Sequence, residues 1–208
     1  MLHINQLHWR ETMNGVTIDC SLDLAVHPAQ SDTVLLTIPG VDGSLDGYKN
    51  KYVRIAEEAQ KAHKVGVVRI SNPFITSFHW ESNPRHALQY IQDNIEQITY
   101  SVEPPNIKVV AHSAGASILG RIAHEYDTIT DILLINPAQK LDAEAIRSGL
   151  QKTKANVTVV FGEKDPSVGF AEQLSSDGHR MIIVDNADHY FSNEHLMTFM
   201  ELPTKYLL

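Results

Sequence analysis

Six short, mainly apolar runs constrain the fold of this chain more than any other feature of its sequence. Strands of a parallel sheet have this character, because helices cover both faces of such a sheet and bury every side chain. The runs lie at residues 34–38, 65–70, 107–110, 132–135, 157–161 and 181–184. The chain is therefore predicted to contain a largely parallel sheet.

Helical patterns fill the gaps between these runs. Their apolar residues recur at intervals of three and four, which places them on one face of a helix. The patterns cover residues 48–63, 84–99 and 114–126, and the end of the chain shows another. Strands that alternate with helices predict an α/β fold, a doubly wound sheet with helices on both faces.

An antiparallel hairpin is predicted before the first of these runs. Asn14-Gly15 favours a tight turn, because both residues readily adopt positive φ. Beyond the turn, alternate residues from Val16 to Val26 are apolar, as in a half-buried strand, and Cys20 falls among them as a core residue. The sequence shows no repeat and no linker-like change of composition, so one domain over residues 1–208 is expected.

The composition argues against several classes of protein. The 208 residues include 17 Lys and Arg against 25 Asp and Glu, a net charge of −8. Such an acidic balance disfavours binding to nucleic acid or to an anionic membrane surface. The single cysteine excludes an internal disulfide framework, and no apolar run approaches the roughly 20 residues that cross a bilayer. Because no signal peptide is evident at the N-terminus, a cytoplasmic protein is expected.

One segment joins an apolar strand, a serine and the start of a helix. It reads VVAHSAGASI over residues 109–118. Small residues stand two positions before and two positions after Ser113, at Ala111 and Gly115, as a tight strand-to-helix turn requires. Such a turn exposes the serine at the edge of the sheet, and the amide of Ala114 can face a developing oxyanion. A serine that only caps the helix is the alternative, but its place after a central strand favours a nucleophile.

Two polar residues that could activate this serine follow later strands. Asp165 comes just after the run at 157–161, and His189 follows the run at 181–184. The carboxyl ends of parallel strands meet at one edge of the sheet, where catalytic groups of open α/β folds gather. Asp185 and Asp188 also lie near His189, but they are too close in sequence to reach behind its ring easily. A Ser-His-Asp set of Ser113, His189 and Asp165 is therefore predicted.

This arrangement resembles the α/β-hydrolase superfamily, and the likeness runs from about residue 34 to the C-terminal helix. The resemblance implies that Ser113 is the nucleophile, that His189 is the general base and that Asp165 is the acid. They stand in the chain order that the superfamily uses. Some members place the acid one strand earlier, where this chain has Asn136, so Asp165 remains the best candidate.

The loop IPGVDGS at residues 38–44 resembles the superfamily's loop after its third strand. The resemblance implies that the amide of Val41 joins that of Ala114 in an oxyanion hole. Many relatives have a histidine before the first glycine of this loop, whereas this chain has Pro39. A flexible glycine-rich turn is the alternative interpretation of the loop.

The connections between strands bear on the substrate. Residues 139–155 have room for one helix only, so no large cap domain is expected. The connection at residues 72–83 carries Phe74, Phe78 and Trp80, which are predicted either to line an apolar substrate pocket or to pack on the domain's own core. An open site with modest apolar walls favours a small-molecule acyl substrate of small or medium size.

The sequence therefore predicts a serine hydrolase, a carboxylesterase or thioesterase that works through an acyl-enzyme and needs no cofactor and no metal. None of the eleven histidines forms an H-E-x-x-H motif or a comparable metal-binding pair. The same three residues could instead cleave an amide or a carbon–carbon bond. A non-catalytic binding protein with the same fold is a further alternative, although an intact Ser-His-Asp set argues against it. The sequence does not predict the oligomeric state.

Overall fold

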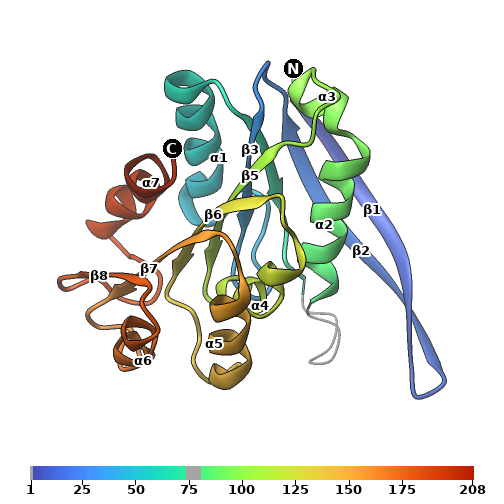
Figure 1. Cartoon of the computed structure of the whole chain (residues 1–208). Coiled ribbons are helices and arrows are strands. Elements are labelled where there is room, and N and C mark those ends of the chain that lie inside the picture. The colour runs from blue at the N-terminus through green and yellow to red at the C-terminus, as the bar shows by residue number, and fades with distance from the viewer. Residues whose placement is uncertain (1, 74–80) are drawn as a thin grey trace.

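A computed structural model describes residues 2–73 and 81–208, and an eight-stranded sheet lies at its centre (Figure 1). The order across the sheet is β1-β2-β4-β3-β5-β6-β7-β8. β1 and β2 pair antiparallel, β2 also lies antiparallel to β4, and every later pairing is parallel. The strands are β1 (His3–Met13), β2 (Val16–His27), β3 (Thr33–Ile38), β4 (Gly66–Ile70), β5 (Asn106–His112), β6 (Ile129–Ile135), β7 (Asn156–Gly162) and β8 (Arg180–Val184).

Helices cover both faces of this sheet, as the alternating pattern predicts. α1 and α7 pack on one face, and the helices from α2 to α6 pack on the other (Figure 1). The helices are α1 (Lys51–Glu58), α2 (Ser82–Asp93), α3 (Ile95–Thr99), α4 (Ala114–Ile122), α5 (Ala143–Lys152), α6 (Phe170–Ser176) and α7 (His195–Tyr206). The predicted doubly wound α/β architecture with an N-terminal hairpin is confirmed.

The two core layers explain why the parallel strands are continuously apolar. In β5, Val109 packs into the layer that contains α4, whereas Val110 packs into the layer that contains α1 and α7. Successive side chains of a strand point to opposite faces, so both positions lose their contact with water. The sequence of β5 therefore shows no alternation between apolar and polar residues.

The hairpin departs from the predicted burial at its far end. β2 pairs with β4 only from Leu24 to His27, so its earlier residues have β1 as a neighbour on one side alone. Val16 is consequently 64% exposed, while Cys20 is buried in the core as predicted. The alternation predicts the strand correctly but not how far it extends past the sheet (Figure 1).

Two predicted helices are interrupted. The pattern over residues 84–99 forms α2 and α3, which are divided at Asn94, where φ is −123° and ψ is 26°. The pattern over residues 48–63 forms a 3-10 turn (Tyr48–Asn50), α1 and a π-helical turn (Ala59–His63). Apolar periodicity indicates which face is buried, but it does not register such local breaks.

The connection between β6 and β7 contains α5 and no further helix or strand, in agreement with the predicted absence of a large cap. Within residues 2–73 and 81–208, no helix is long and apolar enough to cross a membrane.

Candidate active site

Ser113 lies in the tight turn between β5 and α4 with an unusual backbone conformation. Its φ is 56° and its ψ is −123°, a region that residues with a side chain rarely occupy. Its amide donates to the carbonyl of Ile135 at 2.9 Å, and its carbonyl accepts from the amide of Ser117 at 3.1 Å. These bonds hold the strained turn in place, and such strain is concentrated at functional sites.

The glycine at position 115 is required by close packing at this turn. A Cβ atom at Gly115 would lie 2.3 Å from the carbonyl oxygen of Pro39. A Cβ atom at Gly40 would lie 3.1 Å from the Cβ of Ser113. The start of α4 and the loop after β3 are therefore in direct contact, which places that loop beside Ser113.

The structure brings the three predicted catalytic side chains together. Ser113 Oγ lies 2.8 Å from His189 Nε2, and His189 Nδ1 lies 2.5 Å from Asp165 Oδ2. The Asp165 side chain is fully buried, whereas the His189 side chain is 23% exposed. In neutral His189, Nδ1–H donates to the carboxylate and Nε2 accepts from the serine hydroxyl, which is the arrangement a general base needs.

The competing carboxylates do not occupy this position. Asp188 accepts hydrogen bonds from the amides of Tyr190 and Ser192, at 3.1 and 2.8 Å, and so shapes the loop that carries His189. Asp185 is exposed at the end of β8. Asp165 is therefore the carboxylate bonded to the imidazole.

Two residues that the sequence analysis did not assign to the site hold the His189 backbone. Asn136 is fully buried, and its Nδ2 donates to the carbonyls of His189 and Asp188 at 2.9 and 3.3 Å. Its Oδ1 accepts from the amide of Gly162 at 2.8 Å, which links the ends of β6 and β7 to the histidine loop. His112 Nε2 lies 2.9 Å from the same His189 carbonyl.

His112 is a buried ring that can make this hydrogen bond in its neutral form. Burial, reinforced by the nearby ammonium of Lys51, holds the pKa of His112 well below its usual range. The neutral ring donates Nε2–H to the His189 carbonyl. Its position directly before the nucleophile was the only sequence cue to this role.

A cavity of about 450 Å³ opens in front of Ser113. The loop after β3 forms one wall, and His189 and Tyr190 form part of another. Val41 lines this cavity and is 47% exposed, while Ala114 is the buried first residue of α4. Among the described residues, the amides of Val41 and Ala114 donate to no protein acceptor.

Buried polar side chains anchor the loop after β3. Asn72 Nδ2 donates to the carbonyl of Pro39 at 2.9 Å, and Asn83 Nδ2 donates to Asn72 Oδ1 at the same distance. Arg69, which is 3% exposed, donates to the carbonyl of Leu45 at 2.8 Å and to the carboxylate of Asp46 at 2.7 Å. Side-chain hydrogen bonds therefore hold this glycine-rich loop at both of its ends.

The predicted substrate-binding residues Phe74, Phe78 and Trp80 lie outside the described residues. Their role stays a prediction. Among residues 2–73 and 81–208, no three His, Cys, Asp or Glu side chains gather as they would to hold a metal ion.

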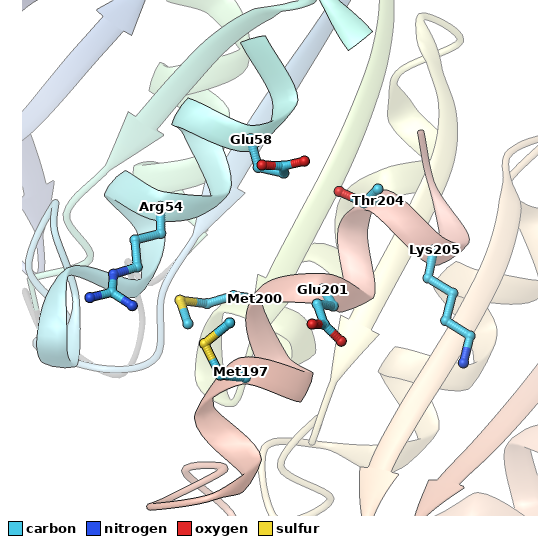
Figure 2. Close-up of a pocket in the computed structure, with 7 residues that line it drawn as sticks. All are labelled: Arg54, Glu58, Met197, Met200, Glu201, Thr204 and Lys205. Atoms are coloured by element: carbon cyan, nitrogen blue, oxygen red, sulfur yellow. The ribbon is translucent and has the colours of Figure 1, made fainter. Parts of the chain in front are cut away.

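A second cavity, of about 470 Å³, lies between α1 and α7 (Figure 2). Met197 and Met200 lie together on its α7 side, and Arg54 and Glu58 project from α1 (Figure 2). None of Ser113, His189 and Asp165 lines it, so it is separate from the candidate active site.

Comparison with solved structures identifies the architecture. Est1E from Butyrivibrio proteoclasticus aligns with a TM-score of 0.68 at 15% identity, covering 95% of this chain and 96% of that one. The esterase Pf2001 from Pyrococcus furiosus aligns with a TM-score of 0.66 at 15% identity, covering 100% of this chain and 94% of that one. The chain has the α/β-hydrolase fold.

A further structural neighbour is a dienelactone hydrolase from Anabaena variabilis, with a TM-score of 0.64 at 17% identity over 98% of this chain and 96% of that one. No family model matches the sequence. No curated protein matches it significantly. The similarity is thus one of fold, and the activity has to be argued from the site itself.

Proposed function

We propose that this protein is a serine hydrolase that cleaves carboxylic esters or thioesters of small to medium acyl groups. The observation that carries the proposal is the continuous hydrogen-bonded chain from Asp165 through His189 to Ser113, which ends at a strained serine facing a cavity. The esterases among the structural neighbours support the same reaction class.

The proposed reaction has two halves. His189 Nε2 takes the proton of the Ser113 hydroxyl as Oγ attacks the acyl carbonyl, and Asp165 stabilises the imidazolium that forms. The tetrahedral oxyanion accepts hydrogen bonds from the amides of Val41 and Ala114. The proton on His189 then passes to the leaving alcohol or thiol, which departs and leaves an ester on Ser113 Oγ.

Water completes the cycle. His189 accepts a proton from water as the oxygen attacks the acyl-enzyme, and the collapse of the second tetrahedral intermediate returns that proton to Ser113. Residues around the site hold the reacting groups in position during these steps. Asn136 and His112 hold the His189 backbone, and the anchors Asn72 and Arg69 hold the loop that carries the Val41 amide.

The cavity sets the range of substrates. Its volume of about 450 Å³ suits a small or medium acyl group, and no cap between β6 and β7 covers it. A panel of 4-nitrophenyl esters from acetate to octanoate, with acyl thioesters beside them, tests the proposal. We expect hydrolysis by the wild type that is strongest for the shorter chains and absent from Ser113→Ala. Equal rates from a folded Ser113→Ala protein would overturn it.

A further inference from the structure

Lys51, the first residue of α1, is a buried cation in the wall of the candidate active site. It is 5% exposed, and it lines the same cavity as Ser113 and His189. Its ammonium lies 3.8 Å from the ring centroid of Phe199 and 5.2 Å from that of Tyr52. Among the described residues, no carboxylate forms an ion pair with it.

This environment is unfavourable for a charged lysine. Lysine is almost never buried without a partner of opposite charge, and aromatic faces replace only part of the hydration that the ammonium loses. Burial accordingly lowers the pKa of Lys51 to about 8. Because that value is still above neutral pH, most molecules carry the charge at pH 7.

The cavity wall around Lys51 is suited to an anion. Of the described residues that line it, Lys51 is the one lysine or arginine. Tyr52 lines the same cavity, and its buried hydroxyl has no hydrogen-bond partner among the described residues. Asp42 also lines the cavity, but this residue already interacts with another group. The Tyr52 hydroxyl is buried and cannot reach a ligand in the cavity, so the Lys51 ammonium is the donor in this wall that lacks an acceptor among the described residues.

A carboxylate offers what this wall lacks. Its two oxygens accept about four hydrogen bonds, and a bond between an ammonium and a carboxylate is stronger than one between neutral groups. A ligand carboxylate would therefore neutralise the buried positive charge of Lys51. The net charge of −8 on the whole chain makes a singly charged ligand a better match than a multiply charged one.

We propose that Lys51 is a specificity-determining residue that binds a carboxylate carried by the substrate. The preferred substrates are then esters or thioesters that bear a free carboxylate in addition to the bond that is cleaved. This inference rests on the proposed serine hydrolase activity, and it names the substrate class of that site.

Paired substrates test the inference. Mono(4-nitrophenyl) adipate and its methyl ester place the charge on the acyl side, and 3-acetoxybenzoate and its methyl ester place it on the leaving group. For each pair, the ratio of kcat/KM for the anionic ester to that for the neutral ester is measured. The proteins are the wild type, Lys51→Met, Lys51→Arg and Lys49→Met, in which an exposed lysine outside the cavity is replaced.

We expect Lys51→Met to lower the ratio by about tenfold or more in at least one pair, which is the effect of losing a charge-assisted hydrogen bond. Lys51→Arg keeps the charge and should stay within about threefold of the wild type, and Lys49→Met should match the wild type. If the ratio for Lys51→Met stays within about twofold of the wild-type ratio in both pairs, the inference is overturned. Loss of a charge-assisted hydrogen bond should change the ratio by more than that.

A binding measurement separates this inference from the proposed function. Hexanoate and hexanamide are titrated into the Ser113→Ala protein and into a double variant that carries both Ser113→Ala and Lys51→Met. The heat of binding or the rise in melting temperature is recorded. Hexanoate that binds more tightly than hexanamide, and only when Lys51 is present, supports the subsite even if the wild type hydrolyses no ester. Equal binding of hexanoate to both proteins contradicts the subsite even if neutral esters are hydrolysed.

Discussion

The variant Asp165→Asn removes the charge of the buried carboxylate while keeping its shape. In the wild type, Oδ2 accepts from His189 Nδ1 at 2.5 Å and Oδ1 accepts from the amide of Ser167 at 2.6 Å. Both contacts need an acceptor, but an asparagine side chain offers only one acceptor atom beside one donor group. The variant can therefore satisfy one of the two contacts, but not both.

Each orientation of the new amide has its own consequence. If the oxygen faces Ser167, the NH₂ group faces His189, so Nδ1 must accept and Nε2 carries the proton toward Ser113. That tautomer cannot act as a base, and a loss of about 10⁴ in kcat is expected, or about 5.5 kcal/mol of transition-state stabilisation. If the NH₂ group instead faces the Ser167 amide, two buried donors oppose each other at a cost of about 1–3 kcal/mol of stability.

The first orientation avoids this opposition of donors, so the loss of activity should dominate. Initial rates with 4-nitrophenyl butyrate give kcat, and thermal denaturation shows whether the variant is folded. Asp185→Asn is the matched control, because that carboxylate is exposed and should leave kcat unchanged. A folded Asp165→Asn protein with kcat within tenfold of the wild type would refute the reasoning.

Three further predictions concern the frame around the site. Asn136→Ala should lower the free energy of unfolding by about 1–3 kcal/mol because its buried partners lose their hydrogen bonds, and it should also lower kcat. A urea unfolding curve that matches the wild type would contradict this prediction. Gly115→Ala should destabilise the protein by about 1–3 kcal/mol because the new Cβ meets a carbonyl oxygen, whereas Gly169→Ala meets nothing within 4 Å and serves as control; equal melting temperatures would be evidence against the packing argument. Burial, with the nearby Arg69 cation, lowers the pKa of His27 to about 4. The unfolded chain therefore binds more protons between about pH 6.5 and pH 4, and stability should be full above this window and fall as the pH falls through it. Replacing His27 with Gln should reduce this dependence in urea titrations at pH 7.5 and 5, and an identical slope would count against it.

The sequence predicts the sheet well because burial on both faces of a strand produces a local pattern in its residues. Each parallel strand appears as a short apolar run, and the strand-to-helix turn at Ser113 appears as small residues at fixed spacing. The breaks at Asn94 and within residues 48–63 produce no such pattern. They depend on single backbone conformations rather than on a repeating pattern.

The parts of the site that the sequence does not reveal depend on long-range contacts. Asn136 lies 53 residues from the carbonyl it holds, and it appears in the sequence only as a position without a carboxylate. The helical pattern places Tyr52 on the buried face of its helix, but a buried lysine beside it runs against the usual preference for exposure. Only the packing of α1 against Phe199 shows that Lys51 lies in the cavity wall.

The most direct test of the central claim is to locate the covalent adduct of a fluorophosphonate by mass spectrometry of the wild-type protein. A working nucleophile next to a general base reacts with such a probe, whereas an ordinary serine does not. The account predicts one adduct, on the peptide that contains Ser113, and none in Ser113→Ala. An adduct on a different residue, or a folded wild-type protein that stays unlabelled, would contradict it.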